Sequence, residues 1–209
     1  MRYSVPVVAD AGVLGLDLDN TVIDYVEAYR VLSRHFGLPD GHVSREAVRS
    51  QLRNGPNDDV EWQRFQALLY SEGLEVAQPA AGVVDLFKTC QHLGVSVVII
   101  SHKTPTSPSG FGARDLRTPA RAWLRKHGIS PGWIPEESVT FHATAREKVA
   151  RIAEVQPLWF MDDLEEILAM NQFPVEVKRV LYRAGSPWVE REDGVAIADF
   201  AALAQQVAL

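Results

Sequence analysis

Two pairs of carboxylates in this sequence each follow a short run of apolar residues. Asp17 and Asp19 end the run that begins at Val13, and Asp162 and Asp163 follow a later run. A carboxylate is costly to remove from water unless it binds a cation or accepts hydrogen bonds. If the two runs are neighbouring buried strands, four carboxylates meet at one edge and repel one another unless a hard cation lies among them. Oxygen-only ligands of this kind suit Mg²⁺, although Asp also favours turns and helix caps.

A hydroxyl and a lysine complete the set of residues that could act on a phosphate. Ser101 follows another apolar run, where its hydroxyl can donate to a phosphate oxygen. Thr144 and Glu147 have the spacing of a capping box, which predicts a helix that begins there and carries Lys148 in its first turn. A lone helix lysine is usually a solvated surface charge, but a helix anchored at the edge that holds the carboxylates favours a functional role. The competing cations are Lys103 and Arg146.

Short apolar runs alternate with helical patterns through most of the chain. The predicted strands are 13–18, 95–100, 138–142, 158–161, 177–182 and 195–197. The predicted helices between and after them are 83–93, 118–127, 145–155, 164–171 and 200–207. This alternation indicates an α/β fold, a three-layer, doubly wound, Rossmann-like parallel sheet with helices on both faces. Ligands of such sheets bind beyond the carboxyl ends of the strands, which is where the residues named above should lie.

A long segment without a predicted strand separates the first two strong strands. Helices are predicted there at 24–36, 44–54 and 58–72, with Trp62, Phe65 and Leu69 as packing residues. We therefore predict a small helical cap, 25–78, inserted into a core domain formed by 1–24 and 79–209.

Two features near the predicted site could contact a substrate. Arg45, Arg49 and Arg53 share one helix face because they are four residues apart. A solvated basic face is the favoured interpretation, and a face that meets a second anionic group of the substrate is the alternative. The loop 104–116 is long enough to favour a function.

The motifs, taken in order, resemble those of the haloacid dehalogenase superfamily of phosphatases. The resemblance covers residues 13 to about 166 and rests on Asp17-x-Asp19-x-Thr21, then Ser101, then Lys148, and then Asp162-Asp163 after successive strands. It implies that Asp17 attacks phosphorus to form an aspartyl-phosphate, and that Asp19 protonates the leaving group and then activates water. The implied ligands of Mg²⁺ are Asp17, Asp19 through its backbone carbonyl, Asp162 and Asp163. The implied phosphate-binding residues are Asn20, Thr21, Ser101, His102 and Lys148.

The residue at position 19 favours one type of reaction within this family. Dehalogenating members lack an acid there and P-type ATPases carry lysine, so Asp19 favours hydrolysis or transfer of phosphate. We predict a Mg²⁺-dependent phosphohydrolase that acts on a small phosphorylated metabolite, a sugar phosphate or a nucleotide. A phosphotransferase or phosphomutase that uses the same residues is the first alternative. A non-catalytic binding module of the same fold is the second, and the intact motif residues disfavour it.

Composition excludes several other classes of partner. A chain with a net charge of −6 lacks the broad cationic field that nucleic-acid binders use. No apolar run approaches the ~18 residues of a membrane span, and the first ten residues do not resemble a secretion signal. The single cysteine, Cys90, cannot form an internal disulfide and is expected to be a buried helix residue. We expect a cytoplasmic protein without nucleic-acid or membrane partners, and the oligomeric state stays open.

Overall fold

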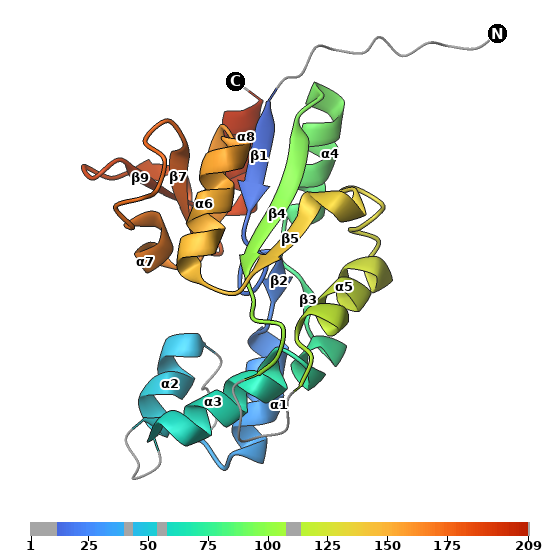
Figure 1. Ribbon diagram of the computed structural model, residues 1–209, viewed down its shortest axis with the longest axis vertical. Helices are drawn as coiled ribbons and strands as arrows, with labels where there is room; N and C mark the ends of the chain where they lie inside the picture. The colour runs from blue at the N-terminus through green and yellow to red at the C-terminus, as the bar shows by residue number, and fades with distance from the viewer. Residues whose placement is uncertain (1–11, 40–43, 54–57, 108–113, 209) are drawn as a thin grey trace, which may run out of the picture.

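The computed structural model describes residues 12–39, 44–53, 58–107 and 114–208. The strands of its main sheet are β1 (Val13–Leu16), β4 (Ser96–His102), β5 (Val139–His142), β6 (Trp159–Asp162), β7 (Lys178–Tyr182), β8 (Val189–Glu190) and β9 (Val195–Ala198). They lie in the order β5-β4-β1-β6-β7-β9-β8 (Figure 1). Every neighbouring pair is parallel except β8 with β9. β1 therefore lies between β4 and β6 in the middle of the sheet, although these strands are far apart in the chain.

Helices cover both faces of this sheet. They are α4 (Val83–Leu93), α5 (Arg117–Lys126), α6 (Ala145–Val155), α7 (Glu165–Leu168) and α8 (Phe200–Val207), with a short 3₁₀ helix η2 (Glu136–Ser138). Side chains of α4, α5 and α8 pack in one buried cluster with Leu14 and Leu16, whereas α6 and α7 pack in a second cluster with Phe160. The two clusters lie on opposite faces because successive side chains of a strand alternate. The predicted doubly wound α/β fold is confirmed.

The predicted strands are all present, with ends that differ by no more than two residues, but three short strands were missed. β2 (Ile23–Asp24) and β3 (Gln78–Pro79) form an antiparallel pair, so the expectation of no strand between the first two strong ones was wrong. β8 was missed as well. Strands of two residues are too short to show an alternating pattern. The predicted helix 164–171 is also shorter than expected, because α7 contains only four residues.

Three helices lie between β2 and β3, in the segment predicted as a cap. They are α1 (Val26–His35), α2 (Arg45–Leu52) and α3 (Asp58–Leu69), and a 3₁₀ helix η1 (Glu72–Glu75) follows them. Figure 1 shows them beyond the carboxyl ends of β1 and β4. The fully buried ring of Phe65 stacks on Tyr29 and Trp62, with ring centroids 5.9 and 6.1 Å apart. The predicted packing role of Trp62, Phe65 and Leu69 is confirmed, since all three are buried.

Two further features of the described chain bear on the sequence predictions. Cys90 is buried in α4, as predicted. Among the described helices, none has the length and apolar character needed to cross a membrane. The first eleven residues and residues 108–113 of the loop 104–116 lie outside the described ranges.

Gly15 allows β1 to approach the residues that cover it. A Cβ at this position would lie 2.5 Å from Cδ2 of Phe160 and 3.1 Å from Cγ of Pro157. We expect Gly15→Ala to lower the free energy of unfolding by about 1–3 kcal/mol, because the buried ring has no free space to move into. Denaturant unfolding measures this loss. The double variant Gly15→Ala/Phe160→Leu should lose less than the sum of the single losses, and strictly additive losses would contradict the proposed clash.

Candidate active site

The pairing of β1 with β6 brings the two acidic strand ends together. The strands are parallel, with Leu16 opposite Met161, and the backbone N–H of Asp17 donates to the carbonyl of Met161 at 2.8 Å. Asp17 is 5% exposed and Asp162 is fully buried. The two carboxylates therefore lie side by side at one edge of the sheet.

Lys148 lies between these two carboxylates. Its Nζ donates to Oδ1 of Asp17 and to Oδ2 of Asp162, both at 2.6 Å, and its side chain is 1% exposed. The helix α6 positions it, because the backbone N–H of Glu147 donates to the Thr144 hydroxyl at 3.1 Å and so caps the helix as predicted. Burial lowers the pKa of Lys148, but attraction to Asp162 and Asp17 outweighs burial and raises the pKa above its usual value. The lysine is therefore held in its charged form.

One lysine does not balance the negative charge of this cluster. Burial raises the pKa of Asp17 to about 7; Lys148 opposes the shift and Asp162 adds to it. Burial also raises the pKa of Asp163 well above its usual value, and repulsion by Asp162 and Asp17 adds to the shift. These pKa values are raised because three carboxylates lie close together in a place with little water, and the nearby cations only partly oppose this effect. A further positive charge would stabilise the ionised forms.

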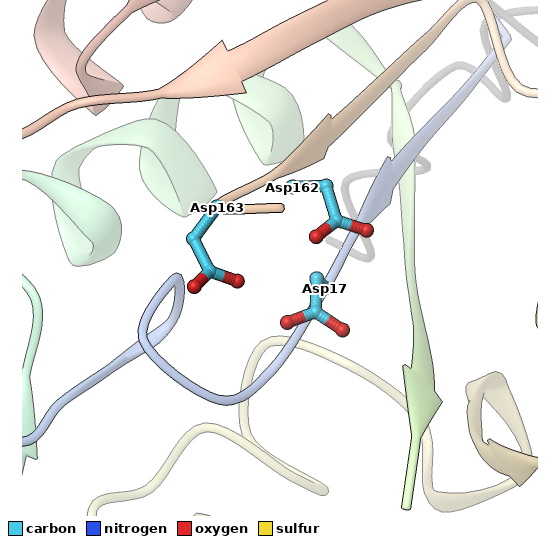
Figure 2. A group of neighbouring side chains, drawn as sticks. All are labelled: Asp17, Asp162 and Asp163. Atoms are coloured by element: carbon cyan, nitrogen blue, oxygen red, sulfur yellow. The ribbon is translucent and has the colours of Figure 1, made fainter. Parts of the chain in front are cut away.

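The three carboxylates fit a magnesium ion. Each of Asp17, Asp162 and Asp163 offers one oxygen, and these oxygens lie within 4.8 Å of one another. Figure 2 shows the carboxylates gathered where β1 and β6 end. One oxygen of Asp162 also accepts the Leu164 N–H at 3.0 Å, which fixes the orientation of this carboxylate. The donor set contains only oxygen and carries excess negative charge, as a hard divalent cation requires.

Asp19 lies in a separate group of contacts next to this cluster. Its Oδ1 accepts the hydroxyl of Tyr25 at 2.7 Å, and its Oδ2 lies 2.7 Å from Nζ of Lys103. Lys103 is 3% exposed and its Nζ lies 4.7 Å from the ring centroid of Tyr70. A carboxylate has about four lone-pair sites, so Asp19 keeps positions for a proton of a substrate. The two lysines thus serve different aspartates, Lys148 at Asp17 and Lys103 at Asp19.

These groups line a cavity of about 240 Å³ at the edge of the sheet. Ser101 belongs to the lining and is 1% exposed, and among the described residues its hydroxyl has no hydrogen-bond partner. A buried donor without a partner costs free energy, which an anionic ligand in the cavity would recover. A second cavity of about 370 Å³ adjoins the first, and the two share Asn20, Arg45 and Asp163.

Solved structures of other proteins share this fold. A haloacid dehalogenase superfamily hydrolase, subfamily IA, from Geobacter sulfurreducens is 14% identical, matches 96% of this chain and 99% of its own, and has a TM-score of 0.54. Protein Tyrosine Kinase A from Mycobacterium tuberculosis is 16% identical, matches 97% and 100%, and has a TM-score of 0.62. A predicted phosphoglycolate phosphatase from Haemophilus somnus is 12% identical, matches 93% and 97%, and has a TM-score of 0.52. This chain has the haloacid dehalogenase fold. Comparison with protein-family models and with curated proteins found no match.

The haloacid dehalogenase fold of this chain brings most of the predicted site residues to one cavity. Seven of them line it: Asp17, Asp19, Asn20, Ser101, His102, Lys148 and Asp163. Asp162 is not part of this lining, but it accepts a hydrogen bond from Lys148, which is. Thr21 is fully buried and, of these two cavities, lines the second. Its position therefore disfavours a direct contact with a phosphate in the first cavity. His102 is exposed, and one ring nitrogen lies 3.2 Å from the carbonyl of Ala143.

Some residues of this site were missed or only partly anticipated from the sequence. Lys103 was named only as a competing cation, yet it follows Ser101 by two residues, directly after the end of β4, and in extended backbone this spacing favours side chains on the same side. Tyr25 and Tyr70 gave no such signal, because aromatic residues in amphipathic helices usually pack in the core. Arg45 was considered with two other arginines, and its separate position is apparent only in the structure.

Proposed function

We propose that this protein is a magnesium-dependent phosphatase that acts on a small phosphorylated metabolite, a sugar phosphate or a nucleotide, through an aspartyl-phosphate at Asp17. The observation that carries the proposal is a single cavity lined by Asp17, Asp19, Ser101 and Lys148. It combines a carboxylate nucleophile, a second carboxylate for proton transfer, and donors for phosphoryl oxygens. The likeness to solved phosphatases and hydrolases supports the same reaction class.

In the first step, one carboxylate oxygen of Asp17 attacks phosphorus. A bond forms between this oxygen and phosphorus, and the bond from phosphorus to the leaving oxygen breaks. Asp19 gives a proton to that oxygen, so the product leaves as an alcohol. Lys148 and Ser101 donate to the phosphoryl oxygens and stabilise their negative charge.

In the second step, Asp19 takes a proton from a water molecule that attacks the phosphorus of the aspartyl-phosphate. The new oxygen–phosphorus bond forms as the bond to Asp17 breaks, which releases phosphate, restores the carboxylate of Asp17 and leaves Asp19 protonated, as the first step requires. The residues that would hold Mg²⁺ are Asp17, Asp162, Asp163 and the backbone carbonyl of Asp19. A bound Mg²⁺ supplies positive charge that screens the attacking carboxylate from the anionic phosphoryl group.

The helices α1 to α3 would act as the cap over this site. Gln66 and Ala67 of α3, and Tyr70 directly after this helix, line the cavity beside the residues of the sheet edge. A cap in this position can exclude water and select the leaving group. The small cavity favours a metabolite over a folded phosphoprotein. We keep 25–78 as the proposed bounds of the cap.

The proposed function predicts release of phosphate from a generic aryl phosphate. We expect hydrolysis of p-nitrophenyl phosphate with Mg²⁺, and a loss of at least about a hundredfold when EDTA removes the metal, because a metal ion contributes several kcal/mol to this type of catalysis. Added Mg²⁺ should restore the rate. The Asp17→Asn protein, purified in parallel, controls for a contaminating phosphatase. An undiminished rate in EDTA would contradict the metal dependence, and no turnover of this or any phosphorylated metabolite in a panel would contradict the function.

Phosphoryl transfer is the second candidate function. The similar chain from Mycobacterium tuberculosis is described as a protein tyrosine kinase. Transfer needs the same first step and differs only because an acceptor hydroxyl replaces water in the second. Incubating the enzyme with p-nitrophenyl phosphate and an added sugar acceptor separates the two functions. A hydrolase releases free phosphate in proportion to nitrophenol, whereas a transferase yields a phosphorylated acceptor instead.

A further inference from the structure

Arg45 occupies a distinct position in the wall of the active-site cavity. It is the first residue of α2, and the hydroxyl of Ser44 accepts the Ala47 N–H at 3.2 Å, which fixes where this helix begins. Arg45 lines the cavity that contains Asp17 and also the adjoining cavity. It is therefore the residue of α2 that faces the proposed reaction centre.

The guanidinium of Arg45 has few partners for its charge. Its side chain is 22% exposed, and among the described residues its buried Nε has no hydrogen-bond partner. Its ion pair is with Glu166, at 3.9 Å, and the Glu166 side chain is 66% exposed. A pair with this distance and exposure contributes little. The guanidinium therefore retains donors for another anionic group.

The other cations of the cavity already have carboxylate partners. Lys148 donates to Asp17 and Asp162, and Lys103 pairs with Asp19. Asp163 also lies in the lining near Arg45, but the proposed function assigns its carboxylate to the metal. Among the fixed cations in the described lining, Arg45 is thus the one not committed to the proposed chemistry.

Arg49 of α2 and Arg53, the residue after this helix, differ from Arg45 in position, although the sequence spaces all three four residues apart. Arg53 pairs with Asp59 at 2.6 Å. Arg49 is half-buried and belongs to the described lining of neither cavity. The interpretation favoured from the sequence, a solvated basic face, therefore does not account for Arg45. The structure separates one arginine at the site from two away from it.

We infer that Arg45 binds a second anionic group of the substrate, so that the site selects phosphate monoesters that also carry a carboxylate or another phosphate. The inference rests on the proposed function. Arginine suits this role because its planar fork binds carboxylate and phosphate through paired hydrogen bonds. Because Arg45 lines both the cavity of about 240 Å³ and the adjoining cavity of about 370 Å³, a second anion bound to it would lie where the two cavities meet.

Two matched pairs of compounds test the inference by equilibrium binding. The first pair is 3-phosphoglycerate and glycerol 3-phosphate, which differ by a carboxylate. The second pair is fructose 1,6-bisphosphate and fructose 6-phosphate, which differ by a phosphate. Calorimetry with the Asp17→Asn protein and Mg²⁺ measures binding without turnover. We expect the compound with the second anion to bind about ten- to a hundredfold more tightly in one pair at least, as a charge-assisted hydrogen bond provides.

Variants of α2 assign this preference to one residue. In the same background, Arg45→Gln should bind the two compounds of a pair with about equal affinity. Arg45→Lys should keep part of the preference for the compound with the second anion, and Arg49→Gln should keep all of it. Circular dichroism confirms that each variant is folded. Equal binding within both pairs, no binding of any of the four compounds, or an equal loss in Arg49→Gln would overturn the inference. Turnover of p-nitrophenyl phosphate by the wild-type protein judges the proposed function separately.

Discussion

Asp17→Asn is expected to abolish turnover of every substrate while the protein stays folded. An amide oxygen is a far weaker nucleophile than a carboxylate, and the loss of a nucleophile typically lowers kcat by at least about 10⁴-fold. The fold should persist because asparagine has nearly the same shape and still offers an acceptor to Lys148. The change also removes a buried carboxyl group, and burial raises the pKa of this group to about 7. Steady-state phosphate release and thermal unfolding measure the two effects.

A matched substitution away from the site shows that the loss is specific to Asp17. Asp85 lies exposed on α4, where it pairs with Lys88, and Asp85→Asn should keep wild-type activity. If Asp17→Asn retained measurable phosphatase activity after purification from a host that lacks background activity, another residue would have to be the nucleophile. A variant that loses activity only because it unfolds would be recognised by its circular dichroism spectrum.

Asp19→Asn is expected to stop the reaction after the first step. An aryl phosphate has a good leaving group, so Asp17 can still attack, but no base remains to activate water for the second step. One equivalent of nitrophenol should appear as a burst, the aspartyl-phosphate should accumulate, and steady-state turnover should fall about 10²–10⁴-fold, the usual contribution of general acid–base catalysis. Rapid mixing measures the burst, and intact-mass spectrometry of acid-quenched enzyme detects the phosphoenzyme.

Tyr25→Phe provides the control for Asp19. It removes one hydrogen bond to the same carboxylate but leaves the carboxylate in place, so turnover should fall by no more than about tenfold, the usual value of one such bond. Normal turnover by Asp19→Asn would contradict the acid/base role. Loss of turnover without a burst would instead place Asp19 in the first step alone.

The acidic strand ends and the helix that carries Lys148 could be predicted because their signals are local. An apolar run that ends in Asp17 or Asp162 marks the end of a buried strand. The spacing of Thr144 and Glu147 marks a helix start through hydrogen bonds within a few residues, and the observed cap has Thr144 as the acceptor. These patterns depend only on neighbours in the chain. They were sufficient to predict the α/β fold and, among the residues that line the cavity, Asp17, Asp19, Asp163, Ser101 and Lys148.

The tertiary structure decided which of these residues act together. The pairing of β6 with β1 determines that Asp162 lies beside Asp17, and strand order depends on packing between segments far apart in the chain. The same packing brings Lys148 to Asp17 and Lys103 to Asp19. It also brings Arg45 to the described lining of the cavity, to which Arg49 and Arg53 do not belong. Sequence patterns specify which face of an element is apolar. The partner of a charged side chain is determined only when distant elements pack, because electrostatic attraction and desolvation depend on distances in space.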